Sequence, residues 1–370
     1  MLYLDNPATT KIKPVSVWAS LIYNNVFNSI NAGRGSHRYS IHGAELVSKT
    51  AENLADLFNI KNPERIIFTQ NATYALNFAI GGILKQGGHV IVTSMEHNSV
   101  LRPVHSFGNY TIVYADESGL INPSDIENAI REDTKLIVCT HASNVCGTIQ
   151  PIGKIGKIAR KHNLVFLVDA AQTAGVVNID VEKMNIDMLA FSGHKGLLGP
   201  LGTGGLYVGE RAEIEPIISG GTGSVSENLE QPKNFPDILQ VGTVNTPSVA
   251  ALSKGVDFVK RTDILKHERK LASEFIECID EFPQIRVLGT KDMSKRNGTV
   301  AFCVGDRDSA EISEMLDKKY HIATRGGWHC AYFAHKTLNS QKHGAVRVGF
   351  GWNNTEKDVL KLIRAIYKIV

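Results

Sequence analysis

Long apolar runs and paired cysteines are both missing from this sequence. No window offers the roughly 18 consecutive apolar residues that a membrane-spanning helix needs, so we expect no membrane segment. The first residues, Met1 to Asp5, also lack the basic region followed by an apolar region that marks a secretion signal. The sequence is therefore interpreted as that of a cytoplasmic protein.

The five cysteines are odd in number, scattered, and never spaced as a Cys-x-x-Cys pair. This spacing argues against a disulfide framework and against a structural zinc site. Cys139, Cys278 and Cys303 lie in apolar strand or helix patterns and are interpreted as small packing residues. Cys146 is interpreted in the same way, although a reactive role stays open. Cys330 differs because it lies in a glycine-containing loop with basic and aromatic neighbours.

Neither sign of charge predominates, since 40 Lys and Arg stand against 37 Asp and Glu, for a formal net charge of +3. Such a balance does not indicate a nucleic-acid-binding surface. Of the 370 residues, 43% are hydrophobic and 21% are charged, which excludes a disordered, collagen-like or coiled-coil protein. We expect a soluble, enzyme-sized protein with one large core and a smaller second domain.

Short apolar segments alternate with helical patterns through the first part of the chain. This alternation predicts a mostly parallel sheet with helices on both faces. The predicted helices are residues 47–58, 123–131 and 151–161. The predicted strands are residues 65–69, 89–93, 111–115, 135–140, 164–169, 187–191 and 205–208.

After the glycine-rich turn at 219–223 the pattern changes to that of a smaller α+β domain. We expect a large domain of residues 16–250, and a small domain of residues 251–370 that is completed by residues 1–15. The elements predicted in the small domain are a helix at 248–280, a strand at 298–304, a helix at 308–319, a strand at 344–350 and a helix at 355–368.

Two neighbouring strand ends carry an acid and an amine. One apolar strand ends in Asp169, and Lys195 follows the next apolar strand. Open α/β sheets bind ligands at such ends. A buried carboxylate needs a cationic partner, and a buried lysine favours a neutral or covalently bound state. Pyridoxal phosphate satisfies both, through a Schiff base with the lysine and a protonated ring nitrogen for the carboxylate. A simple Asp169–Lys195 ion pair is the alternative.

An anion site is predicted where Asn71, Ala72 and Thr73 follow a strand and begin a helical pattern. Backbone N–H groups at a helix N-terminus point toward a bound anion such as a phosphate. Thr73 could instead be an ordinary capping residue, and capping is compatible with phosphate binding.

Six segments in order carry a resemblance over nearly the whole chain: Leu4 to Thr10, Glu96 to Asn98, Ser143 to Gly147, Asp169 to Gln172, Ser192 to Lys195, and Arg325 to Cys330. In these segments the sequence resembles the cysteine desulfurases and selenocysteine lyases, which have the class V aminotransferase fold. The resemblance implies a pyridoxal-phosphate-dependent transferase of fold type I, with a mostly parallel seven-stranded sheet between helices in the large domain.

The resemblance also implies which residues contact the cofactor ring. Lys195 would form the Schiff base, Asp169 would bind the pyridine nitrogen, and His97 would stack on the ring and shuttle a proton. Asn144 and Gln172 match positions that hydrogen-bond the phenolic oxygen. For His97, a buried histidine bonded to a backbone carbonyl is the alternative.

For the phosphate, the resemblance implies contacts from the Ala72 backbone, the Thr73 hydroxyl, Ser192 and His194. Thr222 would reach the phosphate of a neighbouring subunit, so that a homodimer would complete each site. Taken alone, the glycine-rich segment around Thr222 is more typical of an ordinary loop.

The implied substrate is L-cysteine, with its carboxylate on Arg347 and with Asn144 beside it. The Cys330 thiolate would attack the substrate sulfur, which leaves a persulfide on Cys330 and releases alanine. A nearby arginine or a protonated histidine would favour the thiolate. A sulfur-acceptor protein would then take the persulfide sulfur. A structural salt bridge is the alternative for Arg347.

A metal site is a further alternative because His329, Cys330, His335 and His343 fall close together in the sequence, but structural zinc sites favour tighter paired spacings, and we predict none. Arg34 and His37 match a segment at the pocket mouth and are given no chemical step.

Three departures from the family pattern stand out. Pro7 replaces a common alanine, Trp328 replaces a smaller or polar residue, and only sixteen residues separate Cys330 from Arg347. The short separation favours the branch with a short loop, whose members often need a dedicated acceptor protein. Selenocysteine lyase activity is the second hypothesis. Another pyridoxal-phosphate reaction, such as transamination or β-elimination, is the third, and a non-catalytic sulfur carrier is disfavoured by Lys195 and Asp169.

Overall fold

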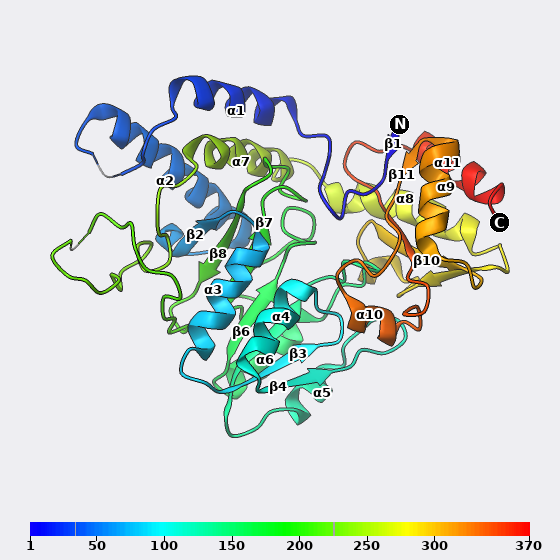
Figure 1. Ribbon diagram of the computed structural model, residues 1–370, viewed down its shortest axis with the longest axis horizontal. Helices are drawn as coiled ribbons and strands as arrows, with labels where there is room; N and C mark the ends of the chain where they lie inside the picture. The colour runs from blue at the N-terminus through cyan, green and yellow to red at the C-terminus, as the bar shows by residue number, and fades with distance from the viewer. Residues whose placement is uncertain (34, 225) are drawn as a thin grey trace.

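The computed structural model describes every residue except 34 and 225, and it has a larger and a smaller lobe (Figure 1). The larger lobe is built on a seven-stranded sheet with the order β2-β8-β7-β6-β5-β3-β4. Its strands are β2 (Ile66–Thr69), β3 (His89–Thr93), β4 (Tyr110–Val113), β5 (Thr134–Thr140), β6 (Val165–Asp169), β7 (Met188–Ser192) and β8 (Gly204–Val208).

The sheet is mostly parallel, which confirms the prediction. Strands β4, β3, β5, β6 and β7 run parallel to one another, whereas β8 is antiparallel to both β2 and β7. A parallel return needs a long crossover connection, usually a helix. Residues 193–203 join β7 to β8 without a helix, so the chain turns back directly. This turn carries Lys195.

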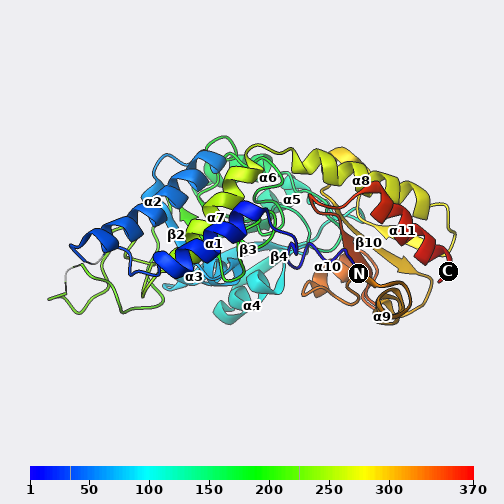
Figure 2. The same cartoon turned by 90° about the horizontal axis from the view of Figure 1, so that it is seen from above.

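Helices cover both faces of the sheet, as Figure 2 shows from above. They are α1 (Val15–Phe27), α2 (Arg38–Phe58), α3 (Ala72–Leu84), α4 (Asn98–Phe107), α5 (Pro123–Asn128), α6 (Ile152–Lys161) and α7 (Thr246–Val259), with a short 3-10 helix, η1 (Pro63–Arg65). Strand side chains alternate between two cores. Phe166 and Val168 pack with residues of α2, α6 and α7, whereas Leu167 packs with residues of α3 and α4.

The smaller lobe has an antiparallel sheet with the order β12-β10-β9. Its elements are α8 (Ile264–Ile279), β9 (Ile285–Leu288), η2 (Met293–Lys295), β10 (Thr299–Val304), α9 (Ser309–Tyr320), β11 (Ile322–Ala323), α10 (Tyr332–Thr337), β12 (Val346–Gly349) and α11 (Glu356–Tyr367). The first strand of the chain, β1 (Leu2–Tyr3), pairs in parallel with β11. Leu2 and Leu4 are buried in the core of this lobe.

The single helix predicted at 248–280 is wrong, because the structure has two helices there. Helix α7 packs in the larger lobe through Leu252 and Val256, whereas α8 packs in the smaller lobe through Leu271 and Phe275. Asp263 begins α8, and its side chain accepts a hydrogen bond from the Lys266 N–H over 3.1 Å. An N-cap of this kind marks the start of a new helix, so α7 and α8 are separate helices and each packs in its own lobe.

The ends of the predicted strands lie within two residues of the observed ends. Helices α1, α4 and α10 and strands β1, β9 and β11 were not predicted. Helix α4 contains Pro103, which normally argues against a helix interior. Helix α1 carries exposed apolar side chains such as Trp18 and Ile22, so it shows no single apolar face. Among the described residues, no helix is both long and apolar enough to cross a membrane.

Candidate active site

A cavity of about 260 Å³ lies at the carboxyl ends of the parallel strands. Loops that follow β5, β6 and β7 line it together with the first residues of α3 and the residues around the start of α4. Parallel strands place such loops at one edge of a sheet, which is why distant segments meet here. The predicted residues on its wall are Ala72, Thr73, His97, Asn144, Asp169, Gln172, Ser192, His194 and Lys195.

Asp169 and Lys195 are brought together by the pairing of β6 with β7, in which Asp169 is opposite Ala190. Burial lowers the pKa of Lys195 to about 8, although the charge of Asp169 opposes this shift. Burial raises the pKa of Asp169. The Ala171 N–H, which donates to Asp169 over 2.9 Å, and the charge of Lys195 lower it in part. The acid and the amine are therefore both desolvated on one wall of the cavity.

At the other side of the cavity, α3 begins with its N–H groups directed at the end of β7. The Asn71 side chain caps α3 and accepts from the Tyr74 N–H over 3.2 Å. The Ala72 N–H donates to Ser192 Oγ over 3.4 Å. Strand β8 approaches closely here because Gly204 has no side chain, and a Cβ atom on it would lie 2.7 Å from Asn71 Cα. Backbone donors and hydroxyls thus converge in the manner of an anion site.

His97 caps α4 and has a defined tautomer. Its Nδ1 accepts from the Ser99 N–H over 3.1 Å, so the proton of the neutral ring is on Nε2. Burial lowers the pKa of His97 to about 4, with further lowering by the charges of Lys195 and Arg347. The Ser99 hydroxyl lies 2.8 Å from both His97 Nδ1 and Thr73 Oγ1. Ser99 lines the cavity but was not predicted, and only its position two residues after His97 could have indicated it.

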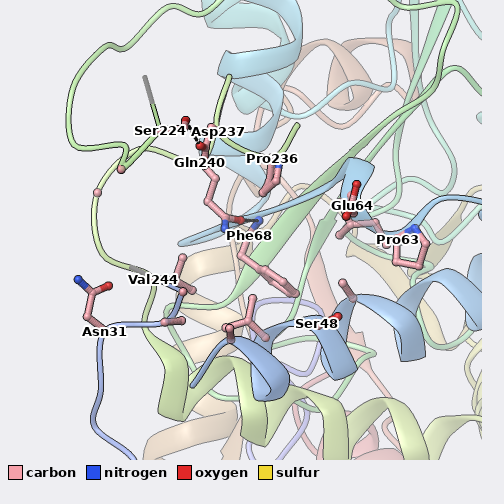
Figure 3. A pocket seen from close by; sticks show the side chains of 18 of the residues that line it. Asn31, Ser48, Pro63, Glu64, Phe68, Ser224, Pro236, Asp237, Gln240 and Val244 are labelled. Atoms are coloured by element: carbon pink, nitrogen blue, oxygen red, sulfur yellow. Dashed lines mark hydrogen bonds between the residues drawn. The ribbon is translucent and has the colours of Figure 1, made fainter. Parts of the chain in front are cut away.

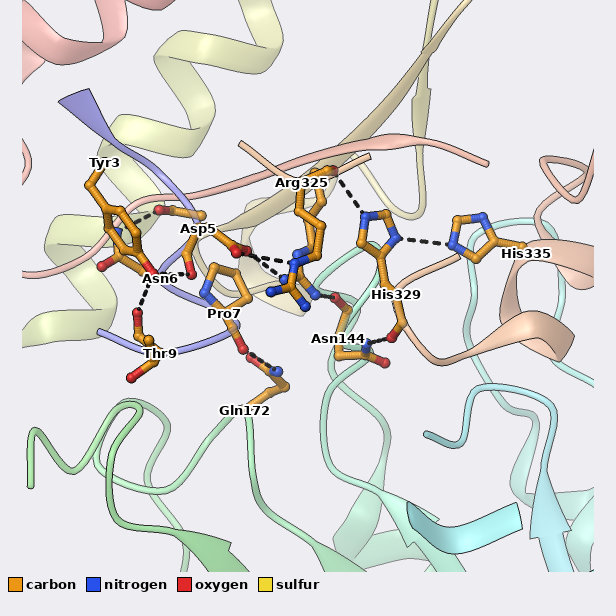
Figure 4. Close-up of polar contacts among 12 residues, drawn as sticks. Tyr3, Asp5, Asn6, Pro7, Thr9, Asn144, Gln172, Arg325, His329 and His335 are labelled. Carbon is orange, nitrogen blue, oxygen red and sulfur yellow. Dashed lines mark hydrogen bonds and ion pairs between the residues drawn. The ribbon is translucent and has the colours of Figure 1, made fainter. Parts of the chain in front are cut away.

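The N-terminal segment holds the turn that carries Lys195. Lys13 Nζ donates to the His194 carbonyl over 2.6 Å, and the Thr10 hydroxyl donates to the Lys195 carbonyl over 3.2 Å. Figure 4 shows Gln172 donating to the carbonyl of Pro7, over 3.0 Å. Because β1 belongs to the smaller lobe, this segment links that lobe to the lysine.

A cluster of charges joins Arg347 to Asp5 in the N-terminal segment, and Figure 4 shows Asp5 and Arg325 of this cluster. Arg347 is buried on β12, and its Nη2 donates to Asp5 Oδ1 over 2.7 Å. The other oxygen of Asp5 accepts from Arg325 Nε over 3.1 Å. Arg347 Nη1 donates to the Asn144 carbonyl over 3.0 Å, whereas its buried Nε has no partner among the described residues. Asp5 was part of the resemblance, but no role was predicted for it.

Cys330 lies in the loop before α10 and is the one exposed cysteine of the five. The Asn144 amide donates to the preceding carbonyl, that of His329, over 2.7 Å, which ties this loop to the cavity wall. Of the two kinds of cation expected near the thiol, a protonated histidine is not His329, because burial and the Arg347 charge hold the pKa of His329 well below its ordinary value. Arg347, whose charge interacts with Cys330, is the neighbouring cation instead. Trp328 is 51% exposed and contacts Tyr332 edge to face.

The other cysteines pack inside the protein to different degrees. Cys139 and Cys146 are buried, and Cys278 and Cys303 are partly buried. The thiol of Cys146 lies 3.2 Å from Thr148 Oγ1. Among the described residues, no group of three or more His, Cys, Asp or Glu side chains is arranged to hold a metal ion.

Thr222 does not line this cavity. It lies in the segment between β8 and α7, beside Gly223 and Ser224, which line a separate cavity of about 640 Å³ between that segment and α2 (Figure 3). His37 caps α2 by accepting from the Ser40 N–H over 3.2 Å. Arg34 lies outside the described residues.

This fold and this edge-of-sheet site are those of a class V aminotransferase. The sequence profile described as "Aminotransferase class-V" matches residues 2–362, and the chain belongs to that family. The particular relatives are cysteine desulfurases. A probable cysteine desulfurase of Methanothermobacter thermautotrophicus is 33% identical over 381 residues, which cover 100% of this chain and 94% of the relative. One from Borreliella burgdorferi is 31% identical over 391 residues, which cover 100% of this chain and 92% of the relative.

Solved structures agree with this assignment. The apo structure of a cysteine desulfurase from Thermococcus onnurineus superposes with a TM-score of 0.92 at 30% identity, covering 100% of this chain and 94% of that one. The cysteine desulfurase CsdA of Escherichia coli, at 24% identity, shares the fold with a TM-score of 0.88, covering 99% of this chain and 94% of that one.

Proposed function

We propose that this protein is a pyridoxal-phosphate-dependent cysteine desulfurase that converts L-cysteine to L-alanine and holds the sulfur as a persulfide on Cys330. The observation that carries the proposal is the Asn144 side chain. It lines the cavity with Lys195 and Asp169 and donates to the loop of the exposed Cys330, while the backbone carbonyl of Asn144 accepts from Arg347. Asn144 thus connects the cavity, the guanidinium of Arg347 and the loop that carries the Cys330 thiol.

The cavity fits pyridoxal phosphate in its donor set. A desolvated amine and a desolvated carboxylate share its wall, and the N-terminus of α3 offers backbone donors for a phosphate. When bound, the cofactor would form a Schiff base with Lys195 and store the electron pair released at the substrate α-carbon. The residues that would hold it are Ala72, Thr73, His97, Asn144, Asp169, Gln172, Ser192, His194 and Lys195.

In this proposal, each side chain has a role that follows from its charge and its position. Arg347 binds the substrate carboxylate with the part of its guanidinium that Asp5 and Asn144 leave free. Lys195 Nζ, with a pKa lowered to about 8, accepts the α-proton. His97 shuttles the proton that its neutral ring carries on Nε2, because Nδ1 accepts from the Ser99 N–H.

Cys330 takes the sulfur. The C–S bond of L-cysteine breaks, a bond forms between that sulfur and Cys330 Sγ, and the thiol protons are retained on the persulfide and on the new methyl group of alanine. The reaction needs no external oxidant, since one thiol and one cysteine yield one persulfide and one alanine. An exposed loop suits this residue because an acceptor protein must reach the persulfide afterwards.

The proposal also includes a homodimer, a cytoplasmic location and a two-domain division. The first boundary stays at residue 15, but the predicted boundary at residue 250 moves to the end of α7, because Leu252 and Val256 of that helix pack in the larger lobe. Thr222 is part of the dimer proposal because it lies away from its own cavity and would have to serve a neighbouring one. A reducing compartment suits five unpaired cysteines. The packing of Leu2 and Leu4 in the smaller lobe supports the assignment of the N-terminal segment to that domain.

The test is to incubate the purified holoenzyme with L-cysteine and a reductant and to measure alanine and sulfide for the wild type and for Cys330→Ala. We expect equal amounts of alanine and sulfide from the wild type and a loss of both in the variant. Alanine formation that does not depend on Cys330 would contradict the persulfide step. Faster release of selenide from L-selenocysteine than of sulfide would instead favour a selenocysteine lyase.

A further inference from the structure

A line of three buried side chains supports the loop of Cys330. His329 Nδ1 lies 3.1 Å from His335 Nε2, and His335 Nδ1 lies 2.8 Å from Ser340 Oγ. At the other end, His329 Nε2 lies 3.1 Å from the carbonyl oxygen of Arg325. The two rings are stacked with centroids 5.3 Å apart, and His335 is fully buried. Figure 4 shows this line from Arg325 to His335.

The direction of each hydrogen bond follows from one group that can only accept. The Arg325 carbonyl accepts, so His329 Nε2 carries a proton, and the neutral ring must accept at Nδ1. His335 therefore donates from Nε2 and accepts at Nδ1 from the Ser340 hydroxyl. Burial lowers the pKa of His335 to about 4, which keeps that ring neutral. One arrangement of protons satisfies every member of the line.

The backbone above this line is in an unusual conformation. His329 and Cys330 have φ angles of 51° and 58°, two consecutive left-handed residues without glycine. Such residues persist only where surrounding contacts hold them. The carbonyls of this turn accept from the Asn144 side chain and from the Asn98 N–H, each over 2.7 Å. The His329 side chain is the anchor on its buried side.

We propose that His335 is a positioning residue for the Cys330 thiol: its Nε2–H group orients the His329 ring, and the ring holds the left-handed turn that carries the thiol. This inference rests on the proposed function. His335 does not line the cavity, so it acts through His329 and not on the substrate. The side chain of His335 is hydrogen-bonded to His329 and Ser340, neither of which is assigned to the cofactor or to the substrate carboxylate.

Three substitutions separate positioning from general stability. His335→Phe keeps a stacked ring but removes the donor to His329, whereas His335→Gln keeps an N–H donor. Ser340→Ala removes only the outer hydroxyl. The matched control is His89→Phe, because His89 is also fully buried and hydrogen-bonded through both ring nitrogens, to Thr134 and Thr111, at the opposite end of the sheet.

Two measurements on the holoenzymes are compared. In His335→Phe we expect kcat for alanine formation to fall about tenfold or more, because a small displacement of a reacting group is costly, with KM for L-cysteine little changed. We also expect amide hydrogens of residues 328–333 to exchange about tenfold faster. His335→Gln should restore both values to near those of the wild type, Ser340→Ala should give a smaller effect in the same direction, and His89→Phe should change neither.

The proposal is wrong if folded His335→Phe has the kcat and the exchange rates of the wild type, or if His89→Phe reproduces its losses. If His335→Phe does not fold, the other two variants test the proposal. A large loss of kcat in His335→Gln, or wild-type amide exchange rates in Ser340→Ala, would overturn it. Hydrogen exchange needs no turnover, so a wild type that makes no alanine would refute the proposed function while the exchange rates still test His335.

Discussion

Arg347 donates from Nη2 to the carboxylate of Asp5 over 2.7 Å, so the arginine assigned to the substrate is held by the N-terminus of the chain. The side chains are 3% and 14% exposed, and Arg325 binds the second oxygen of the same carboxylate. Two guanidinium groups therefore share one carboxylate. This leaves a net positive charge near enough to help lower the pKa of Lys195, and the buried Nε of Arg347 has no hydrogen-bond partner in the described part of the chain.

This contact predicts a large loss of stability in Asp5→Ala. Removing one partner of a buried ion pair leaves a desolvated charge, which typically costs about 3–5 kcal/mol. Urea unfolding measures the loss. The control is Lys61→Ala, which breaks the exposed pair of Lys61 and Glu182 and should leave the unfolding curve unchanged. An equally small effect in both variants would show that Asp5 does not stabilise Arg347.

Arg347→Lys should raise KM for L-cysteine roughly 10- to 100-fold, because an ammonium group cannot reproduce two parallel hydrogen bonds to a carboxylate. Steady-state kinetics of alanine formation give the value. Arg211→Lys is the control, since Arg211 binds Asp187 near the start of β7, at the opposite end of that strand from Lys195. Unchanged KM in Arg347→Lys would remove Arg347 from the substrate site.

Lys195→Met should stabilise the cofactor-free protein at pH 7. The pKa of Lys195 is lowered to about 8 in the fold, so its charge is harder to hold there than in the unfolded chain. That destabilisation is complete below about pH 8 and is relieved as the pH rises toward the ordinary pKa of 10.5. Urea unfolding at pH 7 and pH 10 should therefore show a gain for the variant that shrinks at the higher pH.

The control for this pH dependence is Lys154→Met on the exposed face of α6. We expect its difference from the wild type to be the same at both pH values. A gain in Lys195→Met that does not change with pH would mean that packing of the methionine, and not removal of the charge, causes it.

Ser99→Ala should weaken the binding of pyridoxal phosphate about 3- to 10-fold, because it removes the hydroxyl that joins Thr73 to His97. Fluorescence titration of the cofactor-free protein measures the dissociation constant. Ser106→Ala is the control, since that hydroxyl donates to the Arg102 carbonyl near the exposed end of α4. Equal affinities in the two variants would rule out a contribution from Ser99.

Exposure predicts the order in which the cysteines react. With iodoacetamide and peptide mass spectrometry, Cys330 should be alkylated first, whereas buried Cys139 and Cys146 should react only after unfolding. Cys146→Ala should keep the rate of alanine formation, because its thiol contacts Thr148 and not the cavity. Early alkylation of Cys146, or loss of activity in its alanine variant, would revive a reactive role for it.

The sequence was sufficient for the strands and for the edge of the sheet where the site lies. Strands end in an abrupt change from apolar to polar residues, and parallel strands place those ends together, so the strand pattern alone pairs Asp169 with Lys195. The anion site could also be predicted from the sequence, because Asn71 to Thr73 follow a strand and begin a helix. Their assigned roles stay predictions that the experiments above test.

Helix α7 and helix α8 could not be separated from the pattern alone. Only residues 260–263 separate them, and no glycine or proline there interrupts the helical pattern. Each helix packs in a different lobe. Helix α4 was missed because Pro103 lies inside it, and a proline normally argues against a helix interior. Its Val100 and Val104 nevertheless pack in the core.

The sequence by itself determined the class of fold, the strand ends and the residue types of the site, because these depend on local periodicity and on short motifs. Only the tertiary structure decided that Asp5 binds Arg347, that Ser99 joins Thr73 to His97, and that His335 lies behind Cys330. The physical reason is that hydrogen bonds between buried side chains depend on distances and directions across packed elements. No spacing along the chain encodes the contact between residues 5 and 347.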